Sequence, residues 1–250
     1  MDWLDKYRSE EYYEALPGLP YVQWNSKQLK RPPMFLCRDQ AEAAGFVGDE
    51  TWQEGIFEFE PDPTSLQEKA EPAFLCETPI LAVIKVYNRT LVFRRDYDQF
   101  RRGDRVPEGM SFDRSLHRLK VTYMVALLGE TEEGYRLLHT DKPLQWTPPA
   151  VVGARFSENI YLPLCNLVSR YYGPDLAKYL FAIHLGAKRE KVGQAPDQVI
   201  IHVPVASLPT TESEMEAILV GPDIAEQLHE WYHAYPAKHV RRQQDISLTL

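Results

Sequence analysis

LHRLKVTYMVALLG, residues 116–129, has the pattern of a β-strand with one face buried in a core. Apolar side chains recur at every second position from Leu119 to Leu127, and two residues is the period of a strand. The other face begins polar and turns apolar at Met124. A charged loop at residues 130–134 leads into a second strand at residues 135–139. We expect this hairpin to lie at the centre of a β-rich core.

The flanking segments add further strands and a helix. An almost continuous apolar run begins at Ile80 and is interrupted at Asn88, which predicts either one long bent strand or a tight hairpin. Apolar residues three and four apart predict a helix at residues 154–172. A long strand, two hairpin strands, a helix and two strands follow the order of the OB-fold. We predict an α+β, β-rich fold class, an OB-like curved antiparallel sheet or partly open barrel with flanking helices, built from strands at residues 80–95, 117–128, 134–140, 178–187 and 198–206.

Turn and cap signals divide the chain into three parts. The proline-rich segment at residues 61–65 suggests that residues 1–65 form an N-terminal β/α extension packed on the core. Residues 66–208 would then form the OB-like β core. The segment Thr211–Glu214 has the sequence of a helix capping box, which makes residues 209–250 a C-terminal helical segment.

Composition is typical of a globular protein, with 44% hydrophobic and 26% charged residues. The formal charge of −8 argues against a protein coated in basic charge, but it allows a local basic groove. The three cysteines, Cys37, Cys76 and Cys165, are far apart and form no C-x-x-C motif, so we expect reduced thiols. No signal-peptide pattern opens the chain, and no apolar run approaches the about 20 residues of a membrane span. These features predict a cytoplasmic soluble protein without membrane contact.

Two basic segments occupy the positions of the binding loops in an OB-fold. One is the arginine-rich segment at residues 94–113, and the other is the loop around Lys188. Aromatic residues interleave with arginines in the first segment, a pattern that suits single-stranded nucleic acid because bases stack on aromatic rings while cations meet phosphates. The competing interpretation is that the aromatic side chains fill the core and the charges only solvate the loops. The predicted nucleic-acid-binding residues are Tyr87, Arg89, Phe93, Arg94, Arg95, Arg101, Arg102, Lys188, Arg189 and Lys191.

A second motif, H-E-x-x-H, spans His229 to His233 on a predicted helix. Two histidines four residues apart can bind one zinc ion, with Glu230 between them as the general base for a metal-bound water. With His239 as a third ligand, the spacing resembles the signature of the metzincin peptidases. Pro236 stands where that family has glycine, and proline cannot adopt the positive φ that turns the chain back to the metal. We therefore expect no catalytic residue, cofactor or metal, and a zinc-dependent hydrolase is the alternative.

Three further stretches are residues 19–23, residues 34–36 followed by residues 39–46, and residues 138–145. They resemble a family of cyanobacterial proteins with no assigned activity. The resemblance implies no catalytic residues. The sequence thus predicts a non-catalytic protein that binds single-stranded DNA or RNA, with a zinc hydrolase or a protein-interaction scaffold as alternatives and homo-oligomerisation left open.

Overall fold

The computed structural model describes residues 18–59, 70–93, 96–101, 104, 106, 107, 110, 111, 113, 115–193, 196 and 198–235, with only the backbone at residues 87–91 and 118–120. Its strands are β1 (Tyr21–Trp24), β2 (Met34–Cys37), β3 (Gln53–Glu58), β4 (Ala70–Cys76), β5 (Ile80–Phe93), β6 (His117–Thr131), β7 (Gly134–Leu137), β8 (Leu144–Trp146), β9 (Ile183–His184), β10 (Gly186–Val192) and β11 (Val199–Val205). Its α-helices are α1 (Arg38–Ala44), α2 (Ala150–Phe156), α3 (Leu162–Tyr172), α4 (Glu212–Ala217) and α5 (Pro222–Ala234).

A mixed sheet dominates the described part of the chain. Nine strands form it in the order β3-β4-β2-β1-β8-β6-β5-β9, with β7 paired to β6. Among the described strands the sheet is open, because its end strands β3 and β9 do not pair with each other. The prediction of a β-rich α+β fold is confirmed.

Strand β6 lies inside this sheet, between β8 and β5. It pairs with β5, β7 and β8, all antiparallel. Residues from Tyr123 to Leu128 are at most 1% exposed, so the middle of the strand is buried on both faces. Strand β5 is one long strand with register shifts at Val83/Lys85 and Tyr87/Arg89, which settles the choice between a bent strand and a hairpin.

Two pairings differ from the single antiparallel sheet predicted from the sequence. Strands β10 and β11 pair only with each other and form a separate two-stranded ribbon. Strand β1 pairs with β8 in parallel, through Tyr21↔Gln145 and Val22↔Trp146. Alternation identifies a strand but not its partner, because the partner depends on contacts between residues far apart in sequence. Strands from the first 76 residues therefore share the sheet with the central hairpin.

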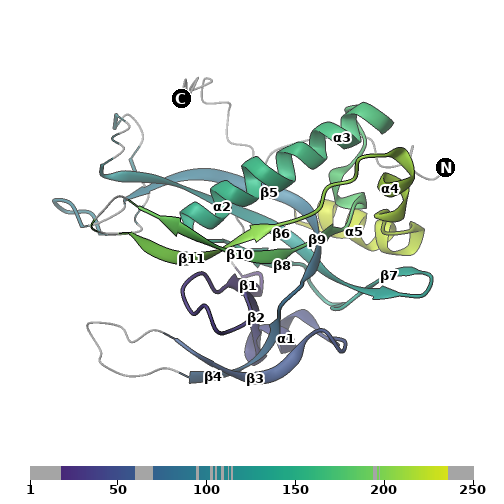
Figure 1. Cartoon of the computed structure of the whole chain (residues 1–250), viewed down its shortest axis with the longest axis horizontal. Coiled ribbons are helices and arrows are strands. Elements are labelled where there is room, and N and C mark those ends of the chain that lie inside the picture. Colours follow the sequence, from purple (N-terminus) through teal and green to yellow (C-terminus); the bar gives the residue numbers. More distant parts are fainter. Residues whose placement is uncertain are drawn as a thin grey trace.

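The long helix covers the core as predicted, but it begins earlier, at Ala150. Helices α2 and α3 join through one π-helical turn at Ser157–Tyr161, which lies just before Pro163. Proline lacks an N–H and crowds the carbonyl four residues earlier, so a wider turn there relieves the clash. Phe156, Ile160 and Leu164 face the core and are at most 1% exposed. Figure 1 shows α2 and α3 on one side of β5 and β6, with β1–β4 and α1 on the other.

The C-terminal helices also follow the sequence. Thr211 and Glu214 form the predicted capping box at the start of α4. Helix α5 buries Ile224, Leu228 and Trp231. Within the ranges that the structure describes, none of the helices is both long and apolar enough to cross a lipid bilayer.

Candidate nucleic-acid interface

The β10–β11 ribbon carries the second predicted basic segment. Successive side chains of a strand point to opposite faces, so Arg189 and Lys191 share one face while Lys188 and Glu190 share the other. On the second face Glu190 accepts hydrogen bonds from the guanidinium of Arg155 on α2, at 2.9 and 2.7 Å. These hydrogen bonds from Arg155 lower the pKa of Glu190. The carboxylate of the ribbon is therefore ionised and already paired with α2.

Lys188 lies beside that pair. Its Nζ is 3.6 Å from Glu190 Oε2, and its cross-strand partner is the buried Val203. Arg189, in contrast, is paired with His202, and Lys191 with Ile200. The structure therefore separates Lys188 from its two predicted partners by placing it on the opposite face of the ribbon.

The loop between β1 and β2, residues 25–33, is held closed by one side chain. Asn25 Nδ2 donates to the carbonyl oxygens of Gln28 and Pro32 at 3.0 and 3.2 Å, and Asn25 Oδ1 accepts from Gln28 N at 3.0 Å. Asparagine suits this role because its short amide can replace backbone hydrogen bonds in a turn. The closed loop leaves Lys27 and Lys30 exposed.

The loop and the ribbon contact each other directly. His202 N donates to Ser26 O at 2.7 Å, and Trp24 Nε1 donates to His202 O at 3.1 Å. Arg189 Nη2 donates to Leu29 O at 3.1 Å. Two of these bonds reach the backbone of His202 in β11, and the third comes from the side chain of Arg189 in β10. Two basic segments from opposite ends of the sequence therefore meet.

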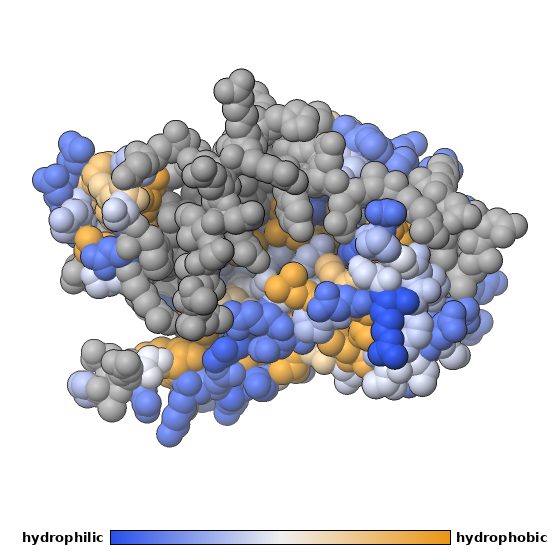
Figure 2. All heavy atoms as spheres, turned by 90° about the horizontal axis from the view of Figure 1, so that it is seen from above, coloured by the Kyte–Doolittle hydropathy of each residue, from blue (hydrophilic) through white to orange (hydrophobic). Residues whose placement is uncertain are grey.

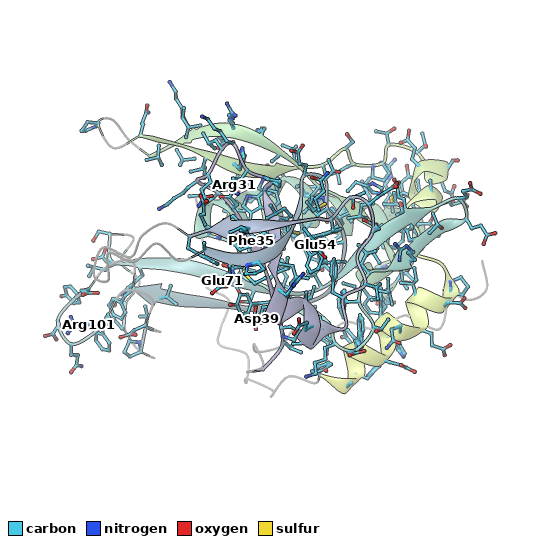
Figure 3. The ribbon with its side chains drawn as sticks, turned by 90° about the horizontal axis from the view of Figure 1, so that it is seen from below. Arg31, Phe35, Asp39, Glu54, Glu71 and Arg101 are labelled. Atoms are coloured by element: carbon cyan, nitrogen blue, oxygen red, sulfur yellow. The ribbon has the colours of Figure 1, made fainter. Side chains whose placement is uncertain are left out.

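We call the resulting cluster the basic surface. Arg31 lies at its border, where it pairs with Glu58 at 2.8 Å and donates to Ile56 O at 2.8 Å. Figure 3 shows Arg31 beside the ribbon. The pair with Arg31 offsets the charge of Glu58, just as Arg155 offsets that of Glu190. The members of the basic surface are Lys27, Lys30, Arg31, Arg189 and Lys191.

His202 lies beneath the basic surface and is 8% exposed. Its pKa is lowered, first by burial and then by the positive charge of Arg189. A neutral imidazole therefore supports the surface at neutral pH, and the positive charge comes from the lysines and arginines.

The first predicted basic segment is only partly described. Arg94, Arg95 and Arg102 lie outside the described residues, and only the backbone of Tyr87 and Arg89 is described. Arg101 is exposed and lies 3.3 Å from Asp96. Figure 3 shows it near the far end of β5 and β6, away from Arg31.

Phe93, in the same segment, is a core residue. It is fully buried and stacks on Phe100 with ring centroids 4.7 Å apart, while the edge of His117 approaches it at 4.9 Å. This packing leaves its ring no exposed face on which a base could stack.

The predicted site did not include Lys27, Lys30 and Arg31. The signal in the sequence was the segment SKQLKRPP, a short basic stretch that ends in two prolines. Its alignment with β10 depends on tertiary contacts, and no local pattern predicts them.

The H-E-x-x-H segment lies on α5, as predicted. His229 and His233 have ring centroids 4.4 Å apart, and Tyr179 OH is 2.9 Å from His229 Nδ1. Glu230 is exposed and accepts from Gln227 Nε2 at 3.2 Å. His239 lies outside the described residues. Within the described part, no third histidine, cysteine, aspartate or glutamate completes a metal-ligand set with these two histidines.

Comparison of the chain with models of protein families, with curated proteins and with solved structures finds no match. The resemblance of residues 19–23, 34–36, 39–46 and 138–145 to a cyanobacterial family stays a prediction.

Proposed function

We propose that this protein binds single-stranded nucleic acid, without catalysis, through the basic surface. The observation that carries the proposal is the hydrogen bond from Arg189 to Leu29, which joins segments 160 residues apart in sequence. Together with the contact between Ser26 and His202, it brings the β1–β2 loop, which carries Lys27 and Lys30, against the ribbon at Arg189.

The charge balance of the site favours a polyanion. The chain carries a net charge of −8, so a local group of cations is a departure from the rest of the molecule. Arg31 is paired with Glu58, and Arg155 on α2 is paired with Glu190, so Lys27, Lys30, Arg189 and Lys191 carry the positive charge of the surface. Nucleic-acid affinity comes largely from cations that replace the counterions of phosphates.

The ribbon also offers apolar contacts for bases. Ile200 is 47% exposed and is the cross-strand partner of Lys191, so its side chain lies on the face of the ribbon that carries Arg189 and Lys191. Figure 2, seen from the side of α2 and α3, shows apolar and hydrophilic side chains that border each other along the lower edge of the molecule. A single strand whose phosphates meet Arg189 and Lys191 would have its bases within reach of Ile200. An unpaired strand suits this arrangement better than a duplex because its bases are accessible.

The proposal keeps an OB-like role for β5 and β6, whose connecting segment contains Arg101, but makes it secondary to the basic surface. The segment around Arg101 would extend the binding path, and the basic surface would form its main part. The contribution of Arg101 can be measured separately because its side chain is exposed and makes a weak surface pair with Asp96.

The test is the salt dependence of binding to a single-stranded oligonucleotide of about 30 nucleotides, longer than the site of one OB-fold. Changing Lys27, Lys30, Arg189 and Lys191 to alanine should reduce the slope of log K against log salt by about 3, since each phosphate contact on a single strand contributes about 0.7.

The matched control is Lys188→Ala, which removes the same charge from the opposite face of the ribbon. It should change the slope by less than the about 0.7 expected for one phosphate contact. Absence of any binding by the wild-type protein at low salt would refute the proposed function. Equal reductions of the salt slope in Lys188→Ala and Lys191→Ala would refute the assignment of the binding site to the face of Arg189 and Lys191.

A further inference from the structure

A second cluster of chemically reactive side chains lies at the junction of β2, α1 and β4. The thiol of Cys37 and carboxylate oxygens of Asp39 and Glu71 all lie within 4.8 Å of one another. Figure 3 shows Asp39 and Glu71 close together beside α1. The cluster is independent of the basic surface and shares none of its residues.

The backbone explains why these three residues converge. Cys37 ends β2 and pairs with Ala73 of the antiparallel strand β4. Glu71 precedes Ala73 by two residues, so its side chain lies on the same face of the sheet as that of Cys37. The chain passes directly from Cys37 into α1, whose first turn contains Asp39.

The surroundings give the cluster a buried end and an open end. Cys37 is 2% exposed and belongs to a small apolar cluster with Phe35, Phe57 and Ala73. Phe35 and Phe57 stack with ring centroids 3.7 Å apart. Asp39, in contrast, is exposed, and its Oδ2 accepts a hydrogen bond from Gln40 Nε2 at 2.8 Å. The sulfur therefore lies against an apolar surface, and water can reach the carboxylates.

The three groups at this junction can act together as ligands of one cation. A thiol sulfur and two carboxylate oxygens, all within 4.8 Å of one another, come from the end of β2, the first turn of α1 and the start of β4. A divalent cation would stabilise all three ionised groups at once.

The ligand types indicate which class of cation fits. Calcium and magnesium select oxygen ligands only, whereas zinc accepts a thiolate together with carboxylates. We propose that Cys37, Asp39 and Glu71 bind one zinc-class divalent cation, with solvent at the open position. The bound ion links the end of β2, the first turn of α1 and the start of β4.

The test is cobalt(II) titration of the purified full chain, followed by competition with zinc. A cobalt–thiolate bond gives a charge-transfer absorption in the near ultraviolet, which histidine and carboxylate ligands do not give. The band should saturate at one equivalent of cobalt and disappear when zinc is added. Cys37→Ser should abolish it, while Cys76→Ser and Cys165→Ser should leave it unchanged.

Because Cys37 is buried, two exposed or half-buried ligands provide tests that do not depend on its packing. Asp39→Asn and Glu71→Gln keep the side-chain shape, and each should weaken cobalt binding at least about 10-fold, the lower end of what loss of even an outer-sphere partner costs. Persistence of the band in Cys37→Ser, unchanged affinity in both amide variants, or no band in the wild-type protein with excess cobalt would each overturn the proposal.

Discussion

Removal of the buried imidazole of His139 should make the protein's stability less sensitive to acid. His139 has no exposed surface and stacks on Trp231 with ring centroids 5.1 Å apart and planes at 3°. Its Nε2 accepts from Leu127 N at 2.9 Å, and its Nδ1 faces Lys142 O at 2.7 Å. The neutral ring with a proton on Nδ1 satisfies both partners. A second proton, on Nε2, would point at the N–H of Leu127.

The size of the effect follows from the pKa. Burial lowers the pKa of His139 from 6.5 to about 4, although the hydrogen bond to Lys142 opposes this shift. Between these two pH values the unfolded chain binds a proton that the folded chain does not. The free energy of unfolding therefore falls as the pH falls from about 6.5 to about 4, and this contribution is constant outside that window. One pKa unit corresponds to about 1.4 kcal/mol. The titration of His139 alone should therefore lower the free energy of unfolding by about 2 kcal/mol between pH 7 and pH 5.

Urea unfolding of the wild-type protein and of His139→Gln at several pH values measures this contribution. The variant should be less stable at pH 7, because it loses the fitted ring, but the difference from wild type should shrink by about 2 kcal/mol at pH 5. Comparison of the two proteins cancels the acid sensitivity of other groups, such as His202 and Glu190, whose pKa values are also lowered. Parallel stability curves over this range would refute the assignment of a depressed pKa to His139.

Three further predictions concern the loop, a helix cap and the histidine pair. Asn25→Ala should lower the free energy of unfolding by about 2 kcal/mol, because the variant loses three side-chain hydrogen bonds worth about 1 kcal/mol each, with partial compensation. The same variant should bind the oligonucleotide more weakly, although Lys27 and Lys30 are intact. Thr211→Ala should cost about 1 kcal/mol in urea unfolding through loss of the cap on α4, and an unchanged midpoint would contradict this. His229→Ala with His233→Ala should leave the metal content of the purified protein unchanged by elemental analysis, and loss of a full equivalent of zinc would instead favour the hydrolase.

Local patterns in the sequence were sufficient to identify most of the main elements of the core. The alternation from Leu119 to Leu127 predicts β6 and its buried face, and the spacing of Phe156, Ile160 and Leu164 predicts the face that the long helix buries. The capping box at Thr211 predicts the start of α4. These features depend on the period of the backbone and on hydrogen bonds within a few residues, so the sequence carries them directly.

Tertiary structure alone decided which of these elements pair and which side chains meet. Nothing local separates β11 from the main sheet, or places β1 in parallel with β8, because strand pairing is set by packing between distant segments. The same holds for both proposed sites. Lys27 becomes a neighbour of Arg189 through the contact between the β1–β2 loop and the ribbon, and Glu71 reaches Cys37 through the register of β2 with β4. The sequence determines the chemistry of each residue, but the position of that residue beside a partner depends on the free energy of the whole packed chain.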